Sequence, residues 1–120
     1  MLFGYVAPAE STYTYYVATN GNDTNPGTLS APFLTIGKGL STLAGGQYLG
    51  ITSGVYAEYI NGGIANGTST TAMTLISGRT STDRPILRPT TSVGDGAAFM
   101  LNGNFAYIHV RDLDVDAVSI

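Results

Sequence analysis

Two periodicities follow each other in the first third of the chain. Tyr13, Tyr15 and Val17 alternate with other residues, and this period of two predicts a short strand. Between residues 33 and 43, apolar side chains recur at steps of three and four, which is typical of one face of a helix. This spacing predicts a short helix at about 35–43. The apolar face of the expected helix consists of Phe33, Ile36, Leu40 and Leu43.

The expected helix contains two residues that disfavour helices, Gly37 and Gly39. Each glycine costs about 1 kcal/mol relative to alanine in a helix interior. Packing of the apolar face, rather than intrinsic propensity, must therefore hold this helix. We expect it to end at residues 44–46, Ala-Gly-Gly, because glycine readily adopts the left-handed conformation that closes a helix.

A loop rich in turn-forming residues lies between the strand and the helix. Residues 20–21, 25–27 and 31–32 read Asn-Gly, Asn-Pro-Gly and Ala-Pro, which are turn signals. The Asn, Asp and Thr side chains of such a loop can hydrogen-bond its backbone. We therefore expect an ordered loop, in which the following side chains are structural rather than metal ligands: Asn22, Asp23 and Asn25.

Short extended runs make up the rest of the chain, separated by loops of Gly, Asn, Ser and Thr. These runs are Tyr48–Thr52, Val55–Ile60, Ala72–Ser77, Pro85–Arg88, Phe99–Asn102 and Ala106–Val118.

The last run changes its apolar phase partway. Ile108 and Val110 share one parity, and Leu113 and Val115 then take the other. In a straight strand this slip would turn one half to solvent. A kink at Arg111–Asp112 would instead let all four side chains face a common core. Two strands joined by such a corner are typical of one coil of a β-solenoid.

The stretches "YYVATNGNDTNPGTLSAPFLTIGKGL" and "SGVYAEYI" resemble the start of right-handed parallel β-helix proteins. These pectin-lyase-like proteins include polysaccharide lyases, glycoside hydrolases and phage tailspikes. The likeness covers roughly Tyr15 to Ile60, and "RPILRP" and "NFAYIHVRDLDVDA" look like the coils that follow. This chain departs from the family at residues 45–47, which are Gly-Gly-Gln where members often have Pro-Gly-Asp.

The resemblance implies a mostly β fold, the start of a right-handed parallel β-helix with a short N-terminal capping helix at about 35–43. Residues 13–120 would be the N-terminal part of one such domain, which we expect to be incomplete. The basic residue that a lyase of this group uses to abstract a proton lies on later coils. We therefore expect no catalytic activity from this chain, and whether its parent protein is an enzyme stays open.

Composition supports the β assignment and narrows the partners. The 120 residues include 16 Gly and 8 Tyr, and only 11% are charged while 43% are hydrophobic, which is unlike a helix-rich protein. The net charge of -3 and the scattered basic residues argue against a nucleic-acid partner. Without cysteine, the chain has neither disulfides nor thiolate metal ligands. No apolar run approaches the ~20 residues needed to span a membrane.

Residues 1–12 are interpreted as a flexible lead-in or a signal-peptide remnant. Ala7-Pro8-Ala9 looks like a signal-peptidase site, but the segment lacks a basic start and a long apolar region. The few charges and the abundant Thr, Asn and Gly suit an extracellular protein or one at a cell or virion surface.

Three aspartates in the last run are the candidate metal site. Alternation places Asp114 and Asp116 on one outward face about 6–7 Å apart, with Asp112 at the kink. Calcium prefers oxygen ligands, and the resemblance implies outward acidic residues that hold calcium against an acidic sugar. Calcium is therefore the expected metal, although a solvated acidic face is the simpler interpretation. No EF-hand is expected, because Ala117 stands where its glycine is required.

No catalytic or cofactor-binding residue is assigned. His109 is expected to face outward, and a lone imidazole without a positioned nucleophile is more often a surface group than a base. Glu58 with Tyr56 could suggest acid–base chemistry, but their run is first of all an early strand.

Three functions are compatible with the sequence. The first is the N-terminal cap and first coils of an extracellular β-helix protein that acts on or binds polysaccharide. The alternative is a structural or adhesive β-helix protein, such as a phage tailspike, fibre or surface-layer component. A third is a small carbohydrate-binding module. We expect self-association or further coils to cover the last coil, whose interior would otherwise be exposed.

Overall fold

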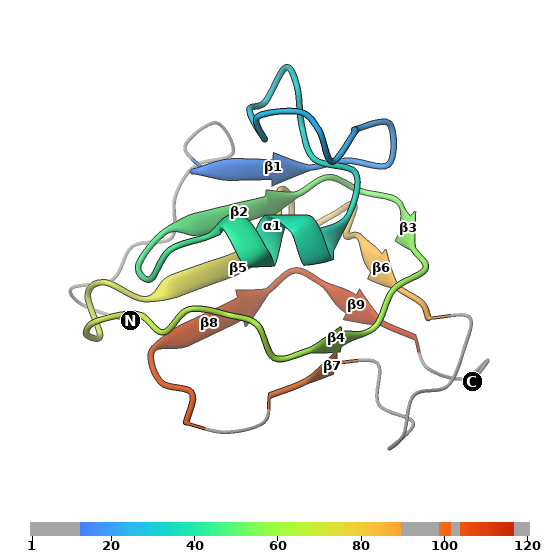
Figure 1. Cartoon of the computed structure of the whole chain (residues 1–120). Helices are drawn as coiled ribbons and strands as arrows, with labels where there is room; N and C mark the ends of the chain where they lie inside the picture. The colour runs from blue at the N-terminus through green and yellow to red at the C-terminus, as the bar shows by residue number, and fades with distance from the viewer. Residues whose placement is uncertain (1–12, 90–98, 102–103, 117–120) are drawn as a thin grey trace.

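The computed structural model describes residues 13–89, 99–101 and 104–116 (Figure 1). The expectations for residues 1–12 and for the ends of the last two extended runs therefore lie outside the described residues. The described chain is mostly strand with one short helix. In order, the elements are β1 (Tyr15–Val17), α1 (Ile36–Thr42), β2 (Tyr48–Ile51), β3 (Val55–Tyr56), β4 (Ile60–Asn61), β5 (Thr74–Gly78), β6 (Ile86–Leu87), β7 (Phe99–Met100), β8 (Ile108–Arg111) and β9 (Asp114–Val115).

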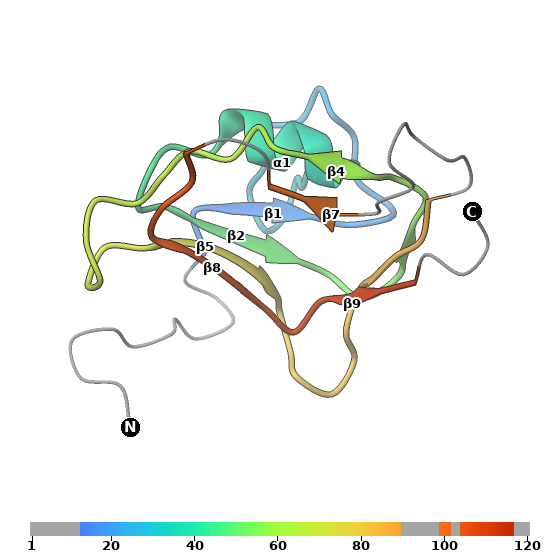
Figure 2. The ribbon, with the colours of Figure 1, turned by 90° about the horizontal axis from the view of Figure 1, so that it is seen from below.

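The strands form three sheets, and every pairing between them is parallel. The first sheet has the order β1-β2-β5-β8, the second β3-β6-β9 and the third β4-β7. Starting with β2, the chain passes through the first, second and third sheets in turn, and then begins again one strand further along. We call one such pass a circuit. Figure 2 shows the three sheets on different sides of a common interior.

Interior side chains of successive circuits lie in register. One column in the first sheet consists of Tyr15, Leu49, Ile76 and Val110, and one in the second consists of Tyr56, Leu87 and Val115. Leu49, Ile76 and Leu87 are fully buried in the main core. Stacking like residues at one face of parallel strands buries them against their neighbours on both sides, which stabilises the register.

The expected kink is present in the last run. β8 ends in the first sheet, β9 begins in the second, and Asp112 between them has a φ of 53°, in the left-handed region. Ile108 and Leu113 pack against the core. Val110 and Val115 continue the interior columns but are 37% and 49% exposed, because β8 and β9 are the last strands of their sheets among the described residues.

The run Val55–Ile60 was expected to be a single strand and is instead two. β3 belongs to the second sheet and β4 to the third, with a corner at residues 57–59. Tyr56 and Ile60 are both buried in the core. The corner keeps both side chains inside while turning Glu58, which has the same parity, toward α1.

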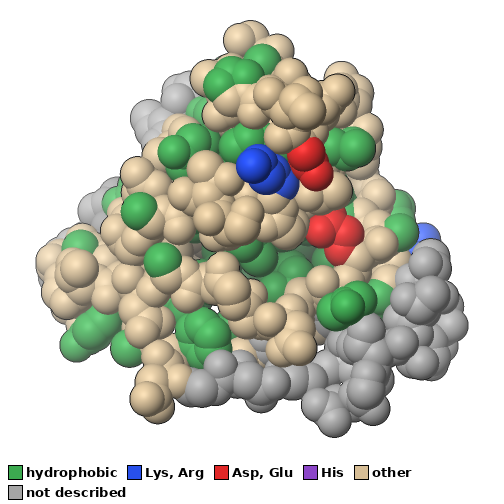
Figure 3. All heavy atoms as spheres, viewed as in Figure 1, with side chains coloured by type: hydrophobic (Ala, Val, Ile, Leu, Met, Phe, Trp, Pro, Cys, Tyr) green, Lys and Arg blue, Asp and Glu red, His purple; other side chains and the backbone are tan. Residues whose placement is uncertain are grey.

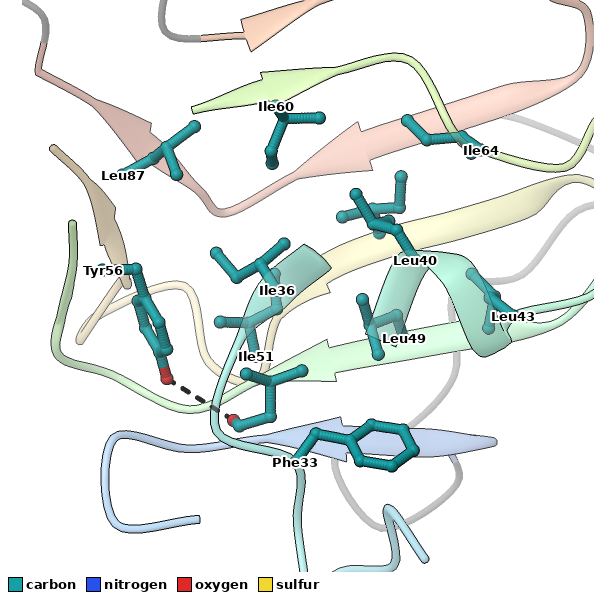
Figure 4. Packing of buried hydrophobic residues seen from close by; sticks show 12 residues of the cluster. Phe33, Ile36, Leu40, Leu43, Leu49, Ile51, Tyr56, Ile60, Ile64 and Leu87 are labelled. Carbon is teal, nitrogen blue, oxygen red and sulfur yellow. Dashed lines mark hydrogen bonds between the residues drawn. The ribbon is translucent and has the colours of Figure 1, made fainter. Parts of the chain in front are cut away.

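The first circuit differs from the later ones. Between β1 and β2, a loop over residues 19–34 and then α1 stand where later circuits have second-sheet and third-sheet strands. α1 lies on the same side of the interior as β4 (Figure 2), and it packs against β1 and β2. Its expected apolar face is confirmed, since all four of its side chains are buried in the core (Figure 4): Phe33, Ile36, Leu40 and Leu43.

The ends of α1 are one residue inside those expected. Thr35 is the N-cap, and its hydroxyl accepts a hydrogen bond from the Lys38 N–H at 3.1 Å. Leu43 is the C-cap, and its extended backbone ends the helix before residues 44–46. Gly39 permits close packing, because a Cβ there would lie 2.8 Å from Leu49 and 3.0 Å from Val17.

The outer edge of β1 is covered by the loop at residues 19–34. The Tyr16 N–H donates to the Gly27 carbonyl at 2.8 Å, and the Phe33 N–H donates to the Tyr16 carbonyl at 2.9 Å. The Ala18 N–H donates to the Phe33 carbonyl at 2.9 Å. The backbone groups of this edge are therefore satisfied within the chain rather than left open to pairing with another strand.

A second, smaller cluster covers the outer face of the first sheet. Tyr13, Tyr16 and Leu75 are buried there, and Tyr48 packs against them. The Tyr13 ring lies on Gly50, where a Cβ would stand 2.7 Å from ring atoms. The described residues contain no helix with the length and apolar character needed to cross a membrane.

Candidate functional site

Each of the three aspartates of the candidate metal site contacts an arginine. Arg84, from the loop between β5 and β6, lies 3.5 Å from the Asp112 carboxylate and 3.4 Å from that of Asp114. The Arg88 Nε lies 2.9 Å from the Asp116 carboxylate. Arginine and aspartate therefore face each other across neighbouring circuits on the outer side of the second sheet.

This arrangement differs from a set of free carboxylates. Across residues 13–89, 99–101 and 104–116, no group of three or more His, Asp or Glu side chains is arranged to hold a metal ion. Calcium needs several oxygen ligands at 2.3–2.6 Å, so an ion here would have to displace the arginines. Calcium binding by Asp112, Asp114 and Asp116 stays a prediction.

Sequence reasoning missed the arginine partners, although a signal for them was present. Arg88 and Asp116 are separated by 28 residues, and Arg84 and Asp114 by 30. These separations are about the number of residues in one circuit. Two residues that far apart in the sequence therefore lie side by side on neighbouring circuits. Pairing charges at that interval would have found both contacts.

A polar hollow lies at the corner between the first and second sheets. It has a volume of about 270 Å³ and is lined by Thr52, Ser53, Arg79, Thr80, Thr82 and Asp83. The Arg79 guanidinium donates to the Thr52 hydroxyl at 3.3 Å, and its central carbon lies 5.3 Å from the centre of the Tyr16 ring. The guanidinium is thus fixed by a hydrogen bond and a cation–π contact.

A second hollow, which we call the edge pocket, lies beside β3. Its volume is about 240 Å³, and its lining residues are Thr19, Leu34, Thr35, Val55, Tyr56, Ala57 and Glu58. The loop of the first circuit and Thr35, the N-cap of α1, form one wall, and β3 with the following corner forms the other. Figure 3 shows the face that carries α1, where hydrophobic, acidic and basic side chains lie close together.

Glu58 and Asp23 both serve the start of α1. The Glu58 carboxylate accepts hydrogen bonds from the Ile36 N–H at 2.8 Å and the Gly37 N–H at 3.0 Å. One oxygen of Asp23 accepts from the Leu34 and Thr35 N–H groups, and the other from the Thr35 hydroxyl. Backbone donors that a helix start leaves unpaired are thereby satisfied from two distant parts of the chain.

Tyr56 is buried in the core rather than placed for acid–base chemistry. Its hydroxyl donates to the Thr52 carbonyl at 2.7 Å (Figure 4 shows the ring among the core side chains). Burial, together with the nearby charge of Glu58, raises the pKa of the Tyr56 hydroxyl above its usual value of 10.0. The phenol therefore stays protonated throughout the neutral range.

The pKa of Asp23 reflects its hydrogen bonds. Burial alone would raise it, but the hydrogen bonds from Thr35 and Leu34 and the charge of Lys38 together hold the pKa below 3.8. The structural role expected of this loop is confirmed for its other two side chains as well. The Asn22 side chain accepts from the Thr24 N–H at 2.9 Å, and the Asn25 side chain donates to the Pro32 carbonyl at 2.9 Å.

His109 lies on β8, in register with Leu75 of the outer cluster. Burial and the charge of Arg111 lower its pKa below 6.5, against an opposing effect of Asp112. Burial and the Arg111 charge thus favour the neutral form of the imidazole.

Comparison with known proteins supports the relationship expected from sequence. Residues 19–64, less than half of the chain, match the family described as a protein of unknown function (DUF1565). No curated protein matches the chain. A solved structure described as the complex of XylC with xylose is similar, with 30% sequence identity and a TM-score of 0.56.

The match with XylC covers 62% of this chain and 11% of that chain. The chain thus spans only a small part of the length of that protein. The mostly strand composition, the parallel sheets and the match to a β-helix structure together confirm the expected mostly β fold class.

Proposed function

We propose that this chain is the N-terminal cap and the first coils of a right-handed parallel β-helix protein that binds or acts on polysaccharide outside the cell or at a cell or virion surface. The observation that carries this proposal is the set of three parallel sheets in a chain 30% identical to a structure described as a xylose complex. Each circuit is one coil in this interpretation, and coils outside this chain would carry any catalytic residues.

The first circuit supports the assignment of a cap. Its loop occupies the outer edge of β1 with backbone hydrogen bonds, and its helix places four apolar side chains in the interior. A first coil without such cover would expose both an unpaired strand edge and a dry core. The loop and α1 together, rather than the helix alone, form the proposed cap.

The other end of the stack favours an assembly role as a second candidate. Val110 and Val115 of the last circuit are 37% and 49% exposed, and Leu101 is 42% exposed. Further coils or a partner subunit stacked on β7, β8 and β9 would bury these side chains.

A structural or adhesive protein would use this end for association, and analytical sedimentation of the chain tests this association. Concentration-dependent association that Val110→Lys abolishes would support this candidate, whereas a monomer at all concentrations would count against it.

Affinity electrophoresis through gels that contain a polysaccharide tests carbohydrate binding. We expect retardation of the chain by xylan, compared with gels without polysaccharide. Parallel gels with polygalacturonate, with and without calcium, test calcium binding by the three aspartates. Retardation that depends on calcium and is lost in the Asp114→Asn variant would support the metal site. Unchanged mobility in every polysaccharide would contradict binding by this part of the protein.

A further inference from the structure

We propose that the edge pocket is a binding subsite for one neutral sugar unit, such as a pentopyranose. This inference rests on the proposed carbohydrate function and assigns it a place. All lining residues of the pocket belong to the described part of the chain. It lies between the first circuit, which contributes loop residues and the helix N-cap Thr35, and β3, the first strand of the second sheet.

The backbone of β3 supplies hydrogen-bonding groups to the pocket. The Ile86 N–H donates to the Gly54 carbonyl and the Arg88 N–H donates to the Tyr56 carbonyl, both at 2.8 Å. These bonds direct the Tyr56 backbone toward β6, so the N–H and C=O groups of its neighbours, Val55 and Ala57, point to the opposite edge. β3 is the first strand of its sheet, and the pocket lies along that opposite edge.

The walls combine polar groups with apolar surface. Leu34 and Val55 are 42% and 47% exposed although both are large hydrophobic residues. Thr19 adds a hydroxyl, and Glu58 adds carboxylate oxygens whose hydrogen bonds from Ile36 and Gly37 of α1 leave further lone pairs available. A sugar ring presents the complementary surface, with C–H groups for the apolar wall and hydroxyls for the donors and acceptors.

Charge selects a neutral ligand over an anionic one. The only charged side chain among the lining residues is Glu58, and it is acidic. A uronate would bring a second carboxylate beside it without a compensating cation, and like charges at short range repel. The expected ligand of this pocket therefore differs from the acidic polysaccharide that the three aspartates suggested.

Size favours a sugar over an extended peptide. The volume of about 240 Å³ is below the ~300–1,000 Å³ of sites for drug-sized ligands. β3 has only two residues, so a peptide could add few ladder hydrogen bonds. One sugar unit can use the available backbone groups without a longer strand edge.

Titration of the isotope-labelled chain with xylose and xylobiose, followed by amide NMR spectra, tests the pocket. We expect saturable shifts at millimolar sugar concentration centred on the Val55 and Ala57 amides, and no such shifts with galacturonic acid. Shifts confined to other surfaces would overturn the pocket while leaving the proposed function intact. Absence of shifts with both neutral sugars would also overturn the assignment of the edge pocket, and so would equal binding of galacturonic acid. Gel retardation by polysaccharide tests the proposed function separately.

Matched variants localise the effect. Leu34→Ala removes part of the apolar wall and should weaken xylobiose binding about three- to tenfold. Leu29→Ala is the control, because Leu29 is also exposed, at 49%, and belongs to the same loop but does not line the pocket. Glu58→Gln should admit galacturonic acid if its spectrum shows a retained fold. Equal effects of the two leucine variants would contradict the assignment.

Discussion

The hydroxyl of Tyr13 accepts a hydrogen bond from the Arg111 guanidinium at 3.1 Å, across a sequence separation of 98 residues. The same hydroxyl donates to the Gly78 carbonyl at 3.4 Å. Arg111 in turn donates from its Nε to the Ser77 hydroxyl at 2.8 Å. The Tyr13 side chain, at the start of the described residues, thus joins β5 and β8 on the outer face of the first sheet.

Tyr13→Phe should lower the free energy of unfolding by about 1–2 kcal/mol, because it leaves the ring in place but removes a bond to a charged donor. Urea unfolding followed by circular dichroism measures the change. Tyr59→Phe is the control, since the Tyr59 side chain is 47% exposed, and surface changes usually stay within about 0.5 kcal/mol. Equal effects of both variants would show that the Tyr13 hydroxyl contributes nothing to stability.

The two glycines of α1 should respond oppositely to alanine. Gly37→Ala adds a Cβ that meets only Glu58, at 3.5 Å, and should raise the free energy of unfolding by about 0.5–1 kcal/mol. Gly39→Ala drives a Cβ against the buried Leu49 and Val17 side chains and should lower it by about 1–3 kcal/mol. Thermal and urea unfolding of the two variants, side by side, checks the signs. A stabilising Gly39→Ala would contradict the packing of α1 described above.

The hydrogen bonds of Asp23 should make stability depend on pH in the acid range. Its folded-state pKa lies below 3.8, so its contribution is complete above the unfolded value of about 3.9 and is lost as pH falls through the folded value. Urea unfolding between about pH 7 and pH 2 measures this dependence. Asp23→Asn should be less stable than the unchanged chain at neutral pH, and the difference should shrink in acid. A difference that does not change with pH would exclude the carboxylate as its cause.

The ion pairs on the second sheet should contribute little to stability. Arg84 and Asp114 are 44% and 56% exposed, and exposed pairs typically couple by less than about 1 kcal/mol. A double-mutant cycle with Arg84→Gln and Asp114→Asn should give a coupling energy in that range that decreases with added salt. A larger, salt-independent coupling would indicate a more specific role for this pair.

Local hydrophobic patterns in the sequence were enough to predict much of the fold. The phase shift between Val110 and Leu113 predicted the kink, because both segments must face one interior. The three- and four-residue spacing predicted the buried face of α1 for the same reason. Each of these inferences needs only the direction of side chains along one element.

Relationships between circuits could not be predicted in the same way. Glu58 has the same parity as Tyr56 and Ile60, so its alternation suggests an inward side chain. It instead reaches α1, because the chain turns a corner between β3 and β4. The edge pocket was likewise missed, since it exists only where the first circuit lacks a second-sheet strand beside β3.

The two carboxylates at the start of α1 bear on the order in which the protein folds during synthesis. α1 has seven residues, two of them glycine, and so short a helix is unstable by itself in water. Asp23 precedes the helix, but Glu58 leaves the ribosome more than twenty residues after Ile36. The first circuit therefore reaches its final form only once the next turn of the chain has been made.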